Sequence, residues 1–83
     1  MNYIIKDSIQ TNKPINSKFI NLIKEQLKPE KINQMDGVKL IWKDRWIHIR
    51  KSNTEPIVRF YSESEDPAES KKLIETAKRL FDN

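Results

Sequence analysis

The sequence predicts an α+β domain in which two helices cover one face of a small antiparallel sheet of three or four strands. Two segments place apolar residues at helical spacing, and between them lie three short segments in which apolar and polar residues alternate. A length of 83 residues limits the chain to one domain, residues 1–83. With 36% hydrophobic and 34% charged residues, the chain can build a modest core under a heavily solvated surface.

The first elements are a short strand and a helix. Residues 3–9 alternate weakly and are expected to form the strand, which a polar stretch follows. Asn16 or Ser17 is a good N-cap for the helix. The helix is expected to end at about Leu27 or Lys28, because the residue before Pro29 is pushed out of helical geometry. Its buried stripe consists of Phe19, Ile20, Ile23 and Leu27.

A hairpin and a third strand follow. Asp36 and Gly37, the only glycine in the chain, form a turn that leads into a strand over residues 38–42. A polar turn joins it to a second strand over residues 46–50. After a polar loop, alternation resumes over residues 57–63, which predicts a third strand.

The chain closes with an amphipathic helix. Asp66 is its cap, Pro67 lies in its first turn, and Glu69 follows three residues after the cap. Both helices then lie on one face of the sheet, and the other face is free for a partner. The buried stripe of this last helix consists of Leu73, Ile74, Ala77, Leu80 and Phe81.

Composition excludes several classes of protein. Without cysteine there are no disulfides and no thiolate zinc site, and one histidine cannot build a histidine-rich metal centre; a reducing, cytoplasmic setting is expected. No apolar run is long enough for a membrane span or a signal peptide, so no membrane partner is expected. The net charge is +4, and residues 1–51 carry 11 basic against 5 acidic groups, which favours an anionic ligand near that part.

The connection between the last two predicted strands is the strongest candidate site. Residues 50–56, Arg-Lys-Ser-Asn-Thr-Glu-Pro, bring a guanidinium, an ammonium, two hydroxyls and an amide into a tight loop, and these groups suit a phosphate. Asn53 tolerates the left-handed backbone with which a loop can turn successive N–H groups toward one anion. Arg59 lies on the same strand face as Tyr61 and offers a second guanidinium. The alternative interpretation is an ordinary polar turn with an arginine at each end.

The longer string DGVKLIWKDRWIHIRKSNTEPIVRFYSESED resembles the C-terminal domain of the α-D-phosphohexomutases, the family of phosphoglucomutase, phosphomannomutase and phosphoglucosamine mutase. In that family an Asp-Gly turn opens a hairpin, a tryptophan begins the second strand, and an Arg-X-Ser-(Gly or Asn)-Thr-X-Pro loop precedes a further arginine. This chain has Asp36-Gly37, Trp46, the loop from Arg50 to Pro56, and Arg59 in the same order. Lys51 departs from the proline or alanine that is frequent in the family.

The resemblance implies a TATA-box-binding-protein-like fold whose loop grips the phosphate of a hexose phosphate or hexose bisphosphate. Arg50, Ser52, Asn53, Thr54 and Arg59 are the phosphate-binding residues that it implies. No catalytic or metal-binding residue is assigned to this chain. The family's phosphoserine, its Asp-X-Asp-X-Asp magnesium loop and its sugar-binding loop have no counterpart here. The chain is therefore expected to be a fragment of a larger cytoplasmic isomerase of carbohydrate metabolism, to act with that enzyme's other domains, and to be inactive alone; magnesium is implied only for the whole enzyme.

Two interpretations from other classes remain at this point. A basic α+β domain with aromatic residues on its strands is also typical of nucleic-acid-binding modules. Against it, alternation places Phe60 with Val58 while Trp46 and His48 lie with Arg50, so we expect the aromatic rings not to share one platform, and no nucleic-acid partner. A pure interaction domain would respond neither to oligonucleotides nor to hexose phosphates.

Overall fold

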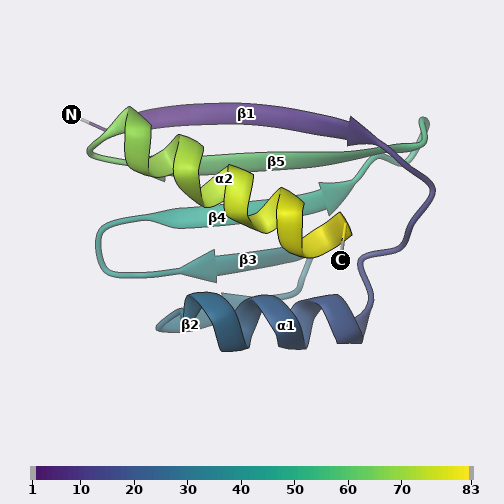
Figure 1. The fold of residues 1–83 in the computed structure, drawn as a ribbon, viewed down its shortest axis with the longest axis horizontal. Helices are drawn as coiled ribbons and strands as arrows, with labels where there is room; N and C mark the ends of the chain where they lie inside the picture. Colours follow the sequence, from purple (N-terminus) through teal and green to yellow (C-terminus); the bar gives the residue numbers. More distant parts are fainter. Residues whose placement is uncertain (1, 83) are drawn as a thin grey trace.

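The computed structural model describes residues 2–82, which form five strands and two helices. The elements are β1 (Tyr3–Gln10), α1 (Ser17–Leu27), β2 (Lys31–Asn33), β3 (Val38–Ile41), β4 (Trp46–Lys51), β5 (Ile57–Ser64) and α2 (Pro67–Asp82). The strands form one antiparallel sheet in the order β1-β5-β4-β3-β2. Both helices lie on the same side of this sheet (Figure 1). The α+β class and the helix placement are confirmed, but the sheet has five strands where three or four were expected.

The additional strand is β2, at the edge beside β3. It has only three residues, and Ile32 lies opposite Leu40 on the helix-covered face. A segment this short contains a single apolar residue, so its sequence carries no alternation from which a strand can be predicted.

Helix α1 begins and ends with specific capping contacts. The Oδ1 atom of Asn16 accepts a hydrogen bond of 3.0 Å from the backbone N–H of Phe19, as expected for an N-cap. At the other end Lys28 has a left-handed backbone (φ 49°). The Trp42 indole N–H donates to the carbonyls of Leu27 (3.2 Å) and Lys28 (3.1 Å), which helps to satisfy helix-end acceptors.

The core lies between the helices and the sheet. The Phe81 ring of α2 packs edge-on against Phe19 of α1, with centroids 4.9 Å apart, and against Phe60 of β5 at 6.4 Å. No helix within residues 2–82 combines the length and apolar character needed to cross a membrane. The buried apolar residues are Phe19, Ile23, Val38, Leu40, Ile47, Ile49, Val58, Phe60, Leu73, Ile74, Ala77 and Phe81.

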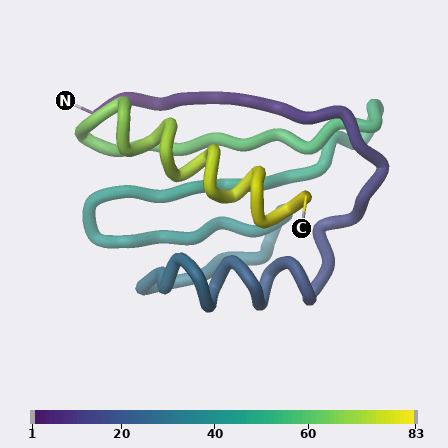
Figure 2. Tube along the Cα trace, in the orientation of Figure 1, coloured from purple at the N-terminus to yellow at the C-terminus, as the bar shows by residue number. Residues whose placement is uncertain are grey.

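The remaining strand residues point to the opposite side of the sheet, which we call the open face because no helix covers it. At one end of the sheet the β1–α1 connection runs past the loop between β4 and β5 (Figure 2). The N–H of Thr11 donates to the carbonyl of Pro56 (2.7 Å), and Lys51 Nζ donates to the carbonyl of Asn12 (3.4 Å). These bonds tie the loop of residues 52–56 to the N-terminal part of the chain.

Candidate functional site

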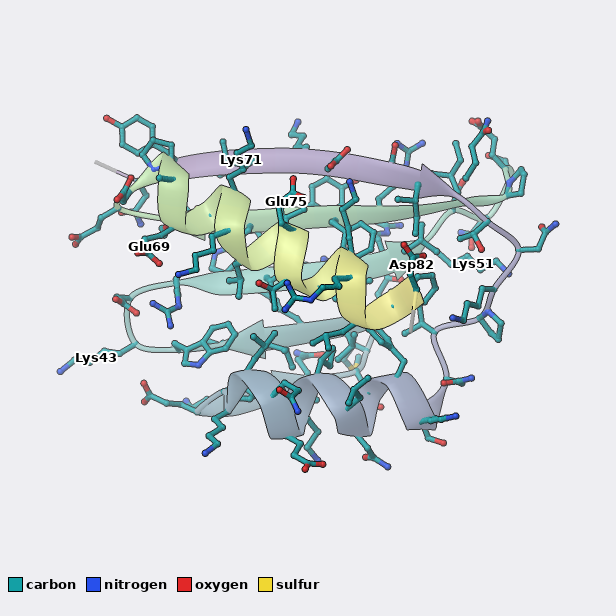
Figure 3. All side chains as sticks on the ribbon, viewed as in Figure 1. Lys43, Lys51, Glu69, Lys71, Glu75 and Asp82 are labelled. Carbon is teal, nitrogen blue, oxygen red and sulfur yellow. The ribbon has the colours of Figure 1, made fainter. Side chains whose placement is uncertain are left out.

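The residues singled out in the sequence lie at this tied end of the sheet and on the neighbouring open face. Arg50 is near the end of β4, the loop of residues 52–56 follows, and Arg59 is near the start of β5. The β4–β5 register places Arg50 directly opposite Arg59. Lys51, labelled in Figure 3, marks this end of the sheet. The pairing therefore brings both predicted guanidinium groups into adjacent positions on one face.

The turn before β3 supports Arg50 from the side. Gly37 has a φ of +67°, and a Cβ atom at this position would overlap the Ile49 carbonyl oxygen and lie 2.9 Å from the Arg50 Cα. The glycine thus lets the turn pack directly on the β4 backbone. Asp36 Oδ2 consequently lies 3.4 Å from a guanidinium nitrogen of Arg50, and His48 Nε2 donates to the Asp36 carbonyl at 2.6 Å.

The Asp36–Arg50 ion pair is a surface pair. The Arg50 side chain is 39% exposed and the Asp36 side chain 59% exposed. Exposed ion pairs of this kind contribute about 0–1 kcal/mol. A phosphate that binds the guanidinium through two oxygens therefore competes with a weak internal partner.

The loop of residues 52–56 directs backbone donors toward the Ser52 hydroxyl. Ser52 Oγ accepts from the N–H groups of Thr54 and Glu55, both at 3.3 Å, and the loop closes through a bond from the Ser52 N–H to the Ile57 carbonyl (2.9 Å). The two bonds to Oγ are long, so an anionic oxygen is a better acceptor for the same donors. Because Ser52 Oγ accepts in both of these bonds, its own hydrogen remains free to donate.

The backbone of this loop differs from the expected one at Asn53. Within residues 2–82, a positive φ outside glycine occurs at Lys28 alone, so the expectation of a left-handed Asn53 is wrong. The N–H groups of Thr54 and Glu55 converge instead because both donate to the Ser52 hydroxyl. The Asn53 and Thr54 side chains make no hydrogen bond within the described chain, and both residues are exposed. Their side-chain donors are directed to solvent.

Arg59 lines a hollow of about 320 Å³ on the open face between β1 and β5. Lys6, Ser8 and Tyr61 also line it, and the β1–β5 register explains why: Ser8 lies opposite Arg59 and Lys6 opposite Tyr61. The loop residues 52–54 are not part of its wall. Alternation already placed Tyr61 on the same face as Arg59, but it did not indicate Lys6 or Ser8, because alternation within each strand cannot tell which strands become neighbours.

Asp7, whose backbone is next to the hollow, points its carboxylate toward the helices. Its Oδ2 atom accepts from Lys78 Nζ of α2 at 2.8 Å, and its Oδ1 atom accepts from the Ser8 N–H at 2.8 Å. The hydrogen bond from Lys78, together with that from Ser8, lowers the pKa of Asp7. The hydrogen bond to Asp7 raises the pKa of Lys78.

Three ring side chains share the open face, contrary to expectation. Phe60 is in the core, as alternation predicted. Tyr61, however, is paired in register with His48, their ring centroids lie 6.2 Å apart, and Trp46 is on the same side of β4. Lys39 Nζ lies 4.4 Å from the centroid of the Trp46 ring. The pairing of Tyr61 with His48 follows from the strand register, which the sequence alone did not reveal.

In the part of the chain that the structure describes, no group of three or more His, Asp or Glu side chains is arranged to hold a metal ion. The residues described here do not fit the magnesium site that the family resemblance implies for the whole enzyme. We therefore assign no metal-dependent step to them.

The fold and the sequence of this chain resemble those of known proteins. The family model described as "Phosphoglucomutase/phosphomannomutase, C-terminal domain" matches residues 4–80. A solved structure of a phosphoglucomutase/phosphomannomutase family protein from Burkholderia thailandensis superposes with a TM-score of 0.61 at 20% identity, and the match covers 94% of this chain and 17% of that one. This chain belongs to the family of phosphoglucomutase/phosphomannomutase C-terminal domains.

Similar sequences occur in mutases of several organisms. The chain is 38% identical over 59 residues to a phosphomannomutase of Methanocaldococcus jannaschii, a match that covers 71% of this chain and 13% of that protein. It is 42% identical over 48 residues to a phosphoglucosamine/phosphogalactosamine mutase of Sulfurisphaera tokodaii, covering 58% and 10%. Over 52 residues it is 36% identical to a phosphoglucomutase/phosphomannomutase of Thermococcus kodakarensis, covering 63% and 11%. The chain thus spans 10–13% of the length of these relatives.

Proposed function

We propose that this domain anchors the phosphate of a hexose phosphate or hexose bisphosphate for a phosphohexomutase. The observation that carries the proposal is the arrangement at one end of the sheet. There the half-exposed Arg50 guanidinium lies directly before a loop whose Ser52 hydroxyl, Thr54 N–H and Glu55 N–H converge. Asn53 and Thr54, both exposed, add side-chain donors from the same loop. Arg59 lies opposite Arg50 and supplies a second positive charge.

These groups match the chemistry of a phosphomonoester. A guanidinium presents two parallel N–H donors to two phosphate oxygens, and hydroxyl and backbone N–H groups donate single hydrogen bonds to the others. The loop is held by hydrogen bonds at both ends, from Ser52 to Ile57 and from Thr11 to Pro56. A loop fixed in this way loses little conformational freedom on binding, which favours affinity.

Anchoring alone does not transfer a phosphoryl group. The transfer needs an in-line nucleophile and neutralisation of the charge that develops. The groups assembled here bind and orient an anion, so we propose that the other domains of a larger phosphohexomutase, with its magnesium, perform the chemistry of this isomerase. Binding energy from the distant phosphate would orient the sugar for that step. The isolated 83-residue chain should then bind hexose phosphate weakly and show no mutase activity.

The lack of cysteine supports a cytoplasmic location.

An amide NMR titration of the 83-residue chain with glucose 1-phosphate and mannose 1-phosphate tests this proposal. We call Arg50, the loop of residues 52–56 and Arg59 together the anchor. We expect saturable shifts concentrated at the amides of residues 50–56 and at Arg59. Inorganic phosphate should compete with both sugars, because the anchor recognises the phosphate. Shifts spread evenly over the lysine residues, or no saturable response, would contradict the proposal.

A second candidate function is nucleic-acid binding, which the shared open face of Trp46, His48 and Tyr61 favours more than the sequence suggested. Two observations weigh against it. Lys39 covers the Trp46 ring, and the Glu63 carboxylate, which accepts from the Trp46 indole N–H at 2.8 Å, places a negative charge where bases would stack. Salt-sensitive binding of single-stranded oligonucleotides at this face, without any response to hexose phosphates, would support this candidate over the anchor.

A further inference from the structure

We propose that the hollow between β1 and β5 is a second oxyanion site, separate from the loop of residues 52–56, and that it takes a phosphate group. The hollow is the open-face depression of about 320 Å³ lined by Lys6, Ser8, Arg59 and Tyr61, and by the backbone of Asp7. Its volume is at the lower end of the roughly 300–1,000 Å³ typical of small-ligand sites. The proposal stands on these residues and does not depend on the loop binding a sugar phosphate.

The charges of the hollow lack an internal counterion. Within residues 2–82 the ion pairs join Arg50 to Asp36 and Lys78 to Asp7, so neither Lys6 nor Arg59 has a carboxylate partner. Arg59 also lies opposite Arg50, and like charges directly opposite each other in an antiparallel pair destabilise the sheet. An anion in the hollow would relieve this repulsion.

The carboxylates near the hollow are occupied elsewhere. Asp7 turns its carboxylate to the helix side, where it is bonded to Lys78 and to the Ser8 N–H. Glu63, on the open face of the same strand as Tyr61, accepts the indole N–H of Trp46. Neither group neutralises the hollow, so its lining attracts an external anion.

The uncharged lining favours a phosphate over a carboxylate. Ser8 and Tyr61 each carry a hydroxyl, so the hollow combines two cations with two neutral donors. A phosphate dianion has three terminal oxygens to engage such a set, whereas a carboxylate has two. Tyr61 is backed by His48, which limits the freedom of its ring.

The test is an amide NMR titration of the 83-residue chain with inorganic phosphate, with acetate at equal ionic strength as the comparison. Lys6→Gln removes a charge from the hollow, and Lys71→Gln is its matched control because Lys71 is exposed on α2, on the other side of the sheet (Figure 3). We expect phosphate to shift the amides of Lys6, Ser8 and Tyr61 along one saturation curve. Lys6→Gln should weaken that curve about two- to fivefold, while Lys71→Gln leaves it unchanged. The dispersion of the amide spectrum checks that each variant is folded.

The possible outcomes separate this site from the anchor. Saturable phosphate shifts at β1 without shifts in the loop would support a phosphate site in the hollow and contradict phosphate binding by the loop. Shifts confined to residues 50–56 would refute the site in the hollow and remain consistent with phosphate binding by the loop. Equal responses to acetate and phosphate, or equal effects of Lys6→Gln and Lys71→Gln, would also overturn it, because the charge alone would then account for binding.

Discussion

Arg50 and Arg59 face each other across β4 and β5, with both side chains on the face of the sheet that no helix covers. Like charges directly opposite each other destabilise an antiparallel strand pair. The pair of arginines therefore lowers the stability of the fold, and under the proposed function it is retained because it binds an anion.

Arg59→Thr should therefore separate stability from binding. Without phosphate and at low salt, the free energy of unfolding should stay equal or rise by about 0.2–1 kcal/mol, because the repulsion is removed while threonine suits a strand. The affinity for phosphate should fall at the same time. Urea unfolding and a phosphate titration measure the two effects, with Arg79→Ala on α2 as control. A variant that is less stable and binds phosphate as tightly as the parent would contradict the interpretation.

Asp36→Asn should strengthen phosphate binding. Asparagine keeps a side chain that suits the turn before Gly37, but it removes the negative charge 3.4 Å from the Arg50 guanidinium. Since the internal pair contributes about 0–1 kcal/mol, we expect a gain in affinity of up to about fivefold, measured by calorimetric or NMR titration. Weaker binding would mean that Asp36 holds Arg50 in its binding orientation, and it would refute the idea that Asp36 and phosphate compete for the guanidinium.

Gly37→Ala should destabilise the domain by more than about 2 kcal/mol. The positive φ alone disfavours alanine by about 1–2 kcal/mol, and the new Cβ would overlap the Ile49 carbonyl oxygen. Lys28→Gly provides the opposite case, because Lys28 has a left-handed backbone at the end of α1, and glycine there should be neutral or stabilising by up to about 1 kcal/mol. Urea unfolding of both variants measures whether the free energy of unfolding falls for Gly37→Ala and stays equal or rises for Lys28→Gly. A mild effect at Gly37 would show that the turn does not pack closely on β4.

Asp7→Asn should lower stability only where the carboxylate is ionised. The hydrogen bond from Lys78 keeps the pKa of Asp7 below its usual value of about 3.9, so the stability it contributes is present above that pH and is lost as pH falls through the folded pKa. The pKa of Lys78 is raised, so its contribution is present below about 10.4 and is lost at higher pH.

Between about pH 4 and pH 10, Asp7→Asn should therefore cost about 0.2–1 kcal/mol, a size typical of an exposed ion pair. The variant and the parent should converge below that window. Urea unfolding across pH measures this, and Glu25→Gln on the exposed side of α1 is the control. A difference that does not shrink as the pH falls below about 4 would mean that the effect does not come from the charge.

Much of the fold was predictable because its signals are local. Alternation groups Ile47 with Ile49 and Val58 with Phe60 within their own strands, and all four are buried in the core. The N-cap and proline signals bound α1 close to its observed limits. β2 was missed because three residues are too few to show a period. Asn53 was misjudged because a side-chain hydroxyl, that of Ser52, organises the loop where a left-handed residue was expected.

The candidate site was predictable only in part. The loop and its two arginines are visible in the sequence, but their neighbours depend on strand order and register. Lys6 meets Tyr61 because β1 pairs with β5, across more than fifty residues of intervening chain. The link from Asp36 to Arg50 likewise depends on the close packing at Gly37. No pattern within a single strand reports such contacts.

The most direct test of the anchor is the affinity of Arg50→Ala for glucose 1-phosphate, measured by NMR or calorimetric titration beside Arg79→Ala. The anchor predicts a loss of about tenfold or more for Arg50→Ala, since charge-assisted hydrogen bonds contribute about 1.5–3 kcal/mol, with the free energy of unfolding changed by less than about 1 kcal/mol. Arg79→Ala should bind as the parent does. Equal affinities for the two variants, both folded, would contradict the claim that this loop and its arginine hold the phosphate.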